Sequence, residues 1–106
     1  MFALIKKIFP RLIRQPDWEV LFQEGALLID VRKEKDFELG HAPRALNIPM
    51  NELETKAEKL KKLNVPVIVV CGSGFKSATA NEILKDKGLE KVYNGGMWFN
   101  FQQFSK

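Results

Sequence analysis

Pro66-Val67-Ile68-Val69-Val70-Cys71-Gly72-Ser73-Gly74-Phe75-Lys76-Ser77 is the stretch of sequence that decides the fold. Four consecutive β-branched residues follow the proline, and a short unbroken apolar run of this kind is typical of a strand buried on both faces of a parallel sheet. The strand is expected to stop at Cys71, where a glycine-rich loop begins. A helix is expected over residues 77–85, ending before Gly88. The stretch therefore predicts a strand, a tight loop and a helix in direct succession.

The loop between this strand and this helix is suited to hold an anion. Backbone N–H groups of a loop that enters a helix converge on one point, and the helix adds the positive end of its dipole. Cys71, the only cysteine of the chain, is expected at the mouth of this cradle, with a pKa below the free-thiol value of about 8.5. Gly72 and Gly74 let the backbone close around the sulfur, and Lys76 adds a positive charge for an anionic substrate. Cys71 is thus predicted to be a nucleophilic thiolate.

A cysteine at the end of a buried strand can also be a small hydrophobic core residue, and most isolated cysteines are. Two features favour the reactive role here. Ligands of open parallel sheets bind outside the carboxyl ends of the strands, where Cys71 is expected, and a structural cysteine needs no glycine-rich anion site after it. We therefore interpret Cys71 as the reactive centre.

Residues 71–77, Cys-Gly-Ser-Gly-Phe-Lys-Ser, resemble the active-site loop of rhodanese-like domains, usually written Cys-x-x-Gly-x-Arg-Ser. The other signatures of that family have counterparts in the same order and spacing, at residues 27–32, 37–49 and 92–96. The resemblance covers about residues 17–104. Lys76 stands where the family usually has arginine, which leaves substrate choice and rate open, because a lysine lacks the bidentate fork of a guanidinium. Arg44 stands where a glycine commonly follows the proline, a departure that touches only a surface turn.

The resemblance implies sulfur transfer of the thiosulfate sulfurtransferase (rhodanese) type. The Cys71 thiolate would take the outer sulfur of thiosulfate or a similar small anionic donor, become a persulfide, and pass the sulfur to cyanide, a small thiol or a protein thiol. The persulfide would be bound by the loop, that is by Gly72, Ser73, Gly74, Phe75, Lys76 and Ser77. This chemistry implies no metal and no organic cofactor.

Two other functions stay open at this point. A low-turnover sulfur carrier or regulatory protein-binding module on the same fold is the main alternative, since Lys76 departs from the usual arginine. A phosphatase of the dual-specificity class related to rhodaneses is less favoured. Those enzymes need a loop one residue longer that ends in arginine, whereas here the basic residue is the fifth after Cys71 and Ser77 is the sixth.

The composition is that of one soluble globular domain. The chain has 106 residues, of which 45% are hydrophobic and 28% charged, and we expect residues 16–106 to form a single rhodanese-like domain. The net charge of +4 comes without a basic and aromatic stripe, so it favours small anions over nucleic acid as partners. One cysteine and one histidine form neither a disulfide nor a cysteine and histidine zinc site within the chain, and a free thiol suits the cytoplasm.

The first 15 residues form an N-terminal segment of uncertain structure. Apolar residues at helical spacing within residues 1–9 suit a short amphipathic helix, and packing against the domain or fraying is preferred over membrane attachment. No stretch of the sequence is long and apolar enough to span a bilayer.

The rest of the sequence alternates between helices and strands. Helices are expected between Asp17 and Gly25, over residues 33–39, from a cap at Asn51 or Thr55 to residue 63, and at the C-terminus. Strands are expected over residues 26–30, 45–48, 67–70 and 90–93, with Gly95 and Gly96 turning the chain after the last. Such alternation implies parallel pairing with right-handed crossovers. The predicted fold class is α/β, a rhodanese-like three-layer α/β/α arrangement with a small, mostly parallel sheet of four to five strands and helices on both faces.

Asp30 and Arg32 are expected at the carboxyl end of a neighbouring strand, where they can line the pocket of Cys71. For Arg32 we favour an ion pair with Glu34 or Asp36, and for Asp30 the binding and structural roles stay open. His41 lies in the turn sequence Gly-His-Ala-Pro and is expected to be structural, because the cradle alone can hold a thiolate.

Three further side chains near the loop and the C-terminus have expected places. The Ser77 hydroxyl is expected to hydrogen-bond in the first helical turn, with a contact to the bound sulfur. Phe75 is expected in the loop itself, shielding the sulfur or offering an apolar docking point. Trp98 and Phe101 are expected in the core.

Overall fold

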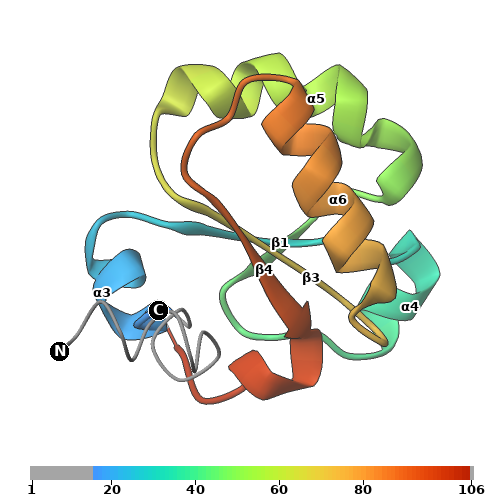
Figure 1. Ribbon diagram of the computed structural model, residues 1–106. Coiled ribbons are helices and arrows are strands. Elements are labelled where there is room, and N and C mark those ends of the chain that lie inside the picture. Colours follow the sequence, from blue (N-terminus) through green and yellow to red (C-terminus); the bar gives the residue numbers. More distant parts are fainter. Residues whose placement is uncertain (1–15, 106) are drawn as a thin grey trace, which may run out of the picture.

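The computed structural model describes residues 16–105 of the chain, so the predicted N-terminal helix lies outside the described residues. Helices and strands alternate as predicted (Figure 1). In chain order the elements are α3 (Trp18–Gln23), β1 (Leu27–Asp30), α4 (Glu34–Leu39), β2 (Ala45–Asn47), α5 (Met50–Leu63), β3 (Val67–Cys71), α6 (Phe75–Asp86), β4 (Val92–Met97) and the 3-10 turn η1 (Trp98–Phe101). None of the helices within residues 16–105 combines the length and hydrophobicity that a bilayer crossing requires.

The described strands form one sheet of four, in the order β2-β1-β3-β4, and every neighbouring pair is parallel. The predicted α/β fold with a small parallel sheet is thereby confirmed. β3 is the central strand that the apolar run predicts, because it pairs with β1 on one side and β4 on the other, and all its residues are buried. The parallel arrangement brings the carboxyl ends of all these strands to one edge of the sheet.

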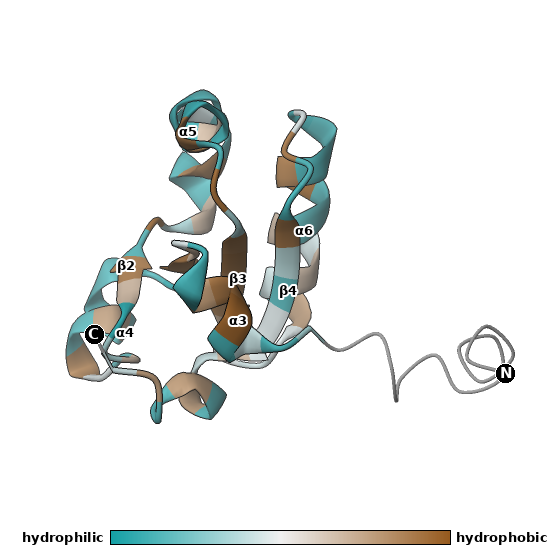
Figure 2. Ribbon diagram, turned by 90° about the vertical axis from the view of Figure 1, so that its left-hand side faces the viewer, coloured by the Kyte–Doolittle hydropathy of each residue, from teal (hydrophilic) through white to brown (hydrophobic). Residues whose placement is uncertain are grey.

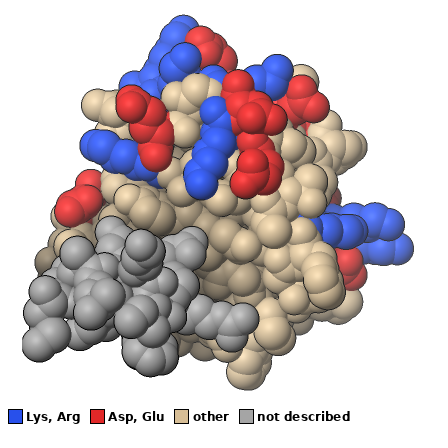
Figure 3. Space-filling view, in the orientation of Figure 1, with Lys and Arg blue, Asp and Glu red and all other residues tan. Residues whose placement is uncertain are grey.

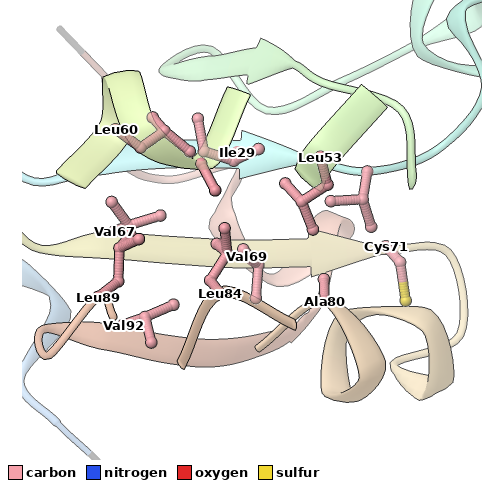
Figure 4. Close-up of a cluster of buried hydrophobic side chains, with 12 residues drawn as sticks. Ile29, Leu53, Leu60, Val67, Val69, Cys71, Ala80, Leu84, Leu89 and Val92 are labelled. Atoms are coloured by element: carbon pink, nitrogen blue, oxygen red, sulfur yellow. The ribbon is translucent and has the colours of Figure 1, made fainter. Parts of the chain in front are cut away.

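Alternate residues of β3 face two separate hydrophobic cores. Val67, Val69 and Cys71 point to the side covered by α5 and α6, as Figure 4 shows. Ile68 and Val70 point to the opposite side, which α3 and η1 cover. This period of two is that of any strand, so the predicted layers of helices on both faces follow from the buried run itself. In Figure 2, β3 is coloured as hydrophobic, while most of α5 is coloured as hydrophilic.

The helix boundaries show which local signals decided and which did not. Asp17 caps α3 as predicted, since its carboxylate accepts a hydrogen bond of 3.3 Å from the amide of Val20. The predicted caps of α5 are wrong: the helix begins at Met50 after Pro49, so Asn51 and Thr55 lie inside it. No capping side chain is used, because amides of the first turn have carbonyl partners: Met50 donates to Val31 at 3.2 Å and Glu52 to Pro49 at 2.8 Å.

The predicted turn at Gly95 and Gly96 is also wrong, because β4 runs through both glycines to Met97. A Cβ atom at Gly95 would lie 2.9 Å from each of three core side-chain atoms, which belong to Ile68, Val70 and Phe101. The glycine therefore lets β4 lie against the core, and the strand accommodates it with a register shift opposite Val69 and Val70. The expected terminal helix is consequently reduced to the single turn η1.

Candidate active site

The loop after β3 folds around the sulfur of Cys71. The amide of Gly74 donates a hydrogen bond of 2.9 Å to Sγ, and the amide of Ser77 donates one of 3.2 Å. Gly74 makes this possible, because its φ of +94° lies in the left-handed region and turns the chain into α6. The helix consequently begins at Phe75, two residues before the predicted start. Of the amides that the sequence predicts around the sulfur, those of Gly74 and Ser77 donate to it, whereas the amide of Phe75 donates to the Ser73 hydroxyl at 3.4 Å.

The sequence predicted Cys71 at the mouth of this site, but Cys71 lies at its floor. Its side chain is 0% exposed, because the position at the end of β3 turns it toward the core under α5 and α6. It nevertheless borders an open cavity of about 430 Å³. The other residues of this cavity are Arg32, Lys33, Lys35, Asp36, Gly72, Ser73 and Lys76. The sulfur is thus shielded from bulk water and adjoins a basic hollow.

The pKa of the Cys71 thiol reflects two opposing effects. Burial by itself raises the pKa, because it disfavours the charged thiolate. Hydrogen bonds to the sulfur from the hydroxyl and amide of Ser77, and from the amides of Gly74 and Ser73, outweigh burial and hold the pKa below that of an ordinary thiol. A larger fraction of Cys71 is therefore thiolate at neutral pH than in a free cysteine.

Ser77 connects the sulfur to β4 through a residue that the sequence did not single out. The buried Ser77 hydroxyl lies 2.9 Å from the carbonyl oxygen of Gly74 and 2.7 Å from Oδ1 of Asn94. The same Oδ1 accepts a hydrogen bond of 2.9 Å from the amide of Gly96. A hydroxyl has one proton, so Asn94 competes with the sulfur for it. The signal for Asn94 was its expected place near the carboxyl end of the last strand, at the same edge as Cys71.

Arg32 lines the cavity and is paired with Asp30, which is buried and does not line it. Nη2 of Arg32 lies 2.8 Å from Oδ2 of Asp30, and Nε donates to Oδ1 at 3.0 Å. The prediction that Arg32 pairs with Glu34 or Asp36 is wrong. Both of those carboxylates are in water, whereas the Asp30 carboxylate is 0% exposed and a buried charge needs a partner.

The Arg32 guanidinium also holds neighbouring segments together. It donates to the carbonyl of Gly40 at 2.7 Å, at the end of α4. It lies 4.5 Å from the ring centroid of Trp98 in η1, a cation–π contact. Phe101 is buried in the core as expected, and Trp98 is partly buried, packing against the same core while it also contacts Arg32 at the site.

His41 and Phe75 lie away from the sulfur. His41 stacks on Phe37 at 3.8 Å between ring centroids, and its Nδ1 lies 2.8 Å from the Phe37 carbonyl oxygen, so the ring is engaged with α4. Phe75 is the first residue of α6 and is 82% exposed. Of its two expected roles, shielding of the sulfur is therefore wrong. Within residues 16–105, no cluster of histidine, cysteine and acidic side chains has the arrangement of a metal site.

A family model of the rhodanese-like domain matches residues 15–98 of this sequence, which include Cys71, its loop and Asn94. The chain belongs to the rhodanese-like family. Among curated proteins, this rhodanese-like chain is 31% identical over 77 residues to the thiosulfate sulfurtransferase GlpE of Coxiella burnetii, covering 73% of this chain and 71% of GlpE. It is 34% identical over 71 residues to the “Putative sulfur carrier protein YrkF” of Bacillus subtilis, a match that covers 67% of this chain and 38% of YrkF.

Solved structures show the same rhodanese-like fold. A rhodanese with anions from E. coli superposes with a TM-score of 0.66 at 28% identity, over 76% of this chain and 94% of that chain. The human single-domain sulfurtransferase TSTD1 shares the fold with a TM-score of 0.65 at 22% identity, over 84% of this chain and 92% of that chain. The relatives named thiosulfate sulfurtransferase and the E. coli rhodanese structure support membership of this sulfurtransferase family.

Proposed function

We propose that this rhodanese-like protein is a sulfurtransferase that carries a sulfane sulfur as a persulfide on Cys71. The single observation that carries the proposal is the pair of amides, from Gly74 and Ser77, that donate to the Cys71 sulfur at 2.9 and 3.2 Å. Such donors stabilise a negative sulfur, which is the state of both the attacking thiolate and the terminal atom of a persulfide. The names of the relatives, thiosulfate sulfurtransferase and sulfur carrier, agree with this chemistry.

In the first step, the Cys71 thiolate attacks the outer sulfur of thiosulfate or a similar anionic donor. A bond forms between Sγ and that sulfur, the sulfur–sulfur bond of thiosulfate breaks, and its electron pair leaves with sulfite. Lys33, Lys35 and Lys76 line the approach and attract the anion. The amides of residues 72–77 then hold the terminal sulfur, with Arg32 in the wall of the site and the buried Asp30 as the partner of Arg32.

In the second step, an acceptor thiolate or cyanide attacks the terminal sulfur. The bond to Sγ breaks and its electrons return to Cys71 as thiolate, so the cycle is balanced without a redox partner. The acceptor carries away one sulfur atom as a persulfide or as thiocyanate. Because Cys71 must be reduced to begin again, a cytoplasmic site of action suits the protein.

Intact mass spectrometry tests this proposal. After incubation with thiosulfate and removal of excess reagent, the wild-type mass should rise by one sulfur atom, and cyanide should remove it. Cys71→Ser should show neither the adduct nor turnover, because a serine hydroxyl is not ionised at neutral pH. A wild-type protein that stays unmodified by thiosulfate and by other sulfane donors would overturn the persulfide mechanism.

A low-turnover sulfur carrier is the second candidate, favoured by Lys76 in place of the usual arginine and by the similarity to YrkF. An ammonium holds an anionic donor less specifically than a guanidinium does. Steady-state turnover with thiosulfate and cyanide should be compared with the rate of a single persulfide-forming event. A carrier loads at a useful rate but turns over slowly, and Lys76→Arg should then raise turnover more than it raises loading.

A further inference from the structure

The cavity over Cys71 is the middle of a longer trough along the carboxyl edge of the sheet. Two hollows of about 370 Å³ each adjoin it. One continues to Met50 and Asn51 at the start of α5, and the other continues to Leu39 and Trp98. The residues they share with the central cavity are Lys33 and Lys76 for the first, and Arg32, Asp36 and Gly72 for the second.

The trough is much larger than the small donor requires. Each of its three parts falls in the range of about 300–1,000 Å³ that is typical of sites for drug-sized ligands. Thiosulfate has five atoms and would occupy only the central part above the sulfur. The flanking hollows therefore have room for a longer molecule that reaches Cys71 from either side.

The trough is basic, although the domain around it is neutral. The chain has 17 basic and 13 acidic residues, and the first 15 residues contain four basic and no acidic ones, so residues 16–106 balance at 13 against 13. Three lysines, Lys33, Lys35 and Lys76, line the trough against the carboxylate of Asp36. Within residues 16–105 the ion pairs are Arg32–Asp30 and Lys87–Glu54, so these lysines have no carboxylate partner there. Their charge is free for a partner.

Large apolar side chains stand exposed near the same edge. Phe75 at the start of α6 is 82% exposed, and Leu39, which lines one flanking hollow, is 88% exposed. Phe99 in η1 is 61% exposed and Met97, in register with Cys71, is 45% exposed. Figure 3 shows charged side chains gathered over α5 and α6, while the surface over η1 and the end of β4 carries none. Exposed aromatic side chains beside unpaired charges are typical of protein-binding surfaces.

We propose that the sulfur acceptor is a protein whose acceptor cysteine lies on an extended acidic segment flanked by apolar residues, and that this segment binds along the trough. This inference rests on the sulfurtransferase function proposed above and names its partner. Carboxylates of the segment would face Lys33, Lys35 and Lys76, and its apolar residues would contact Leu39, Phe75 and Phe99. The segment's thiolate attacks the terminal sulfur of the persulfide, and Cys71 leaves as thiolate.

Binding is tested first, with fluorescein-labelled peptides of leucine and aspartate around a central serine, against matched peptides with lysine for aspartate. The acidic peptide should bind about tenfold more tightly at low salt, since a few exposed charge pairs supply a factor of that size. The double variant Lys33→Glu and Lys35→Glu should abolish this preference. Lys91→Glu, an exposed lysine just before β4 at the opposite edge of the sheet, should keep it.

The apolar contacts have a matched control of the same kind. Phe75→Ser combined with Phe99→Ser should weaken the binding of the acidic peptide. Leu63→Ser, at a side chain that is 54% exposed at the end of α5, should leave that binding unchanged. Circular dichroism establishes that each variant is folded. Equal binding of acidic and basic peptides, or tighter binding of a single-stranded RNA oligonucleotide than of the acidic peptide, would overturn the inference.

Transfer is tested second, with peptides that carry cysteine in place of serine. Persulfide-loaded protein should transfer its sulfur to the acidic peptide faster than to the basic one. The binding test needs no persulfide, so a failure to load with thiosulfate counts against the proposed function alone. Normal loading with no preference between the peptides, in binding or in transfer, counts against the acidic partner alone.

Discussion

Replacing Arg32 by methionine should destabilise the protein strongly, because it leaves a buried carboxylate without its cation. Asp30 is 0% exposed and accepts hydrogen bonds from Nε and Nη2 of Arg32. Removing one partner of a buried ion pair typically costs 3–5 kcal/mol in the free energy of unfolding, roughly. The Arg32 side chain is 13% exposed and borders a cavity, which admits water, so we expect the lower end, about 3 kcal/mol.

The matched control is Arg44→Met. The Arg44 guanidinium also lies over an aromatic ring, 4.4 Å from the centroid of Phe22, and donates to the Ser105 carbonyl at 2.8 Å. Since the recorded partners of Arg44 include no carboxylate, its loss should cost only about 1 kcal/mol. The difference between the two variants therefore isolates the charge of Asp30.

Urea denaturation followed by far-UV circular dichroism measures these costs. For a domain of this size, the free energy of unfolding lost in Arg32→Met corresponds to a melting temperature lower by roughly 12–24 °C. The double variant Asp30→Asn and Arg32→Met removes both charges, so it should cost less than the sum of the single changes, with a coupling of about 2 kcal/mol. Equal losses for the two arginine variants, or strict additivity in the double variant, would refute the argument from a buried pair.

Three further predictions concern the loop and β4. Ser77→Ala should raise the pKa of Cys71, because the buried thiolate loses a hydroxyl donor. The pH midpoint of iodoacetamide alkylation should rise with that pKa. Thr79→Ala, on the exposed side of α6, should leave the midpoint unchanged. Because the folded-state pKa of Cys71 is lowered, its thiolate contributes stability that is full above the unfolded value of about 8.5 and is lost as pH falls through the folded pKa. The free energy of unfolding of wild type relative to Cys71→Ala, from urea titrations, should therefore rise with pH across that window. A difference that does not change with pH would contradict this prediction. Gly95→Ala should cost about 1–3 kcal/mol by overpacking against Ile68, Val70 and Phe101. Gly96→Ala meets no atom within 4 Å, so its cost should come only from a φ of +78°, about 1–2 kcal/mol, and calorimetry of the two variants checks both.

Much of the fold was predictable because its signals are local. A run of β-branched residues predicted the central strand, and alternation of helices and strands predicted the parallel sheet. The prediction failed where a residue's neighbours come from distant segments. Gly95 and Gly96 suit a turn by composition, yet Gly95 lies in a strand because Ile68, Val70 and Phe101 leave no room for a Cβ.

The candidate site divides in the same way. The loop from Cys71 to Ser77 was predictable, since one short stretch supplies the sulfur, the amides and the helix start. Asn94 and Trp98 were missed as neighbours of the site, because Asn94 reaches Ser77 across 17 residues and Trp98 reaches Arg32 from η1. The pairing of Arg32 was missed because Asp30, not Glu34 or Asp36, turned out to be the buried carboxylate.

The sequence by itself determined the strand, the glycine-rich loop and the amides around one cysteine, because backbone conformation and hydrogen bonds between near neighbours depend on residues that are close in the chain. Only the tertiary structure decided how deep the sulfur lies, which carboxylate holds Arg32, and which side chains line the trough. Burial and charge pairing depend on which segments pack together, and that is set by the whole sheet and its two layers of helices. The hydrogen bonds from the loop to the Cys71 sulfur were therefore predictable from one segment, while the wider surroundings of the sulfur were not.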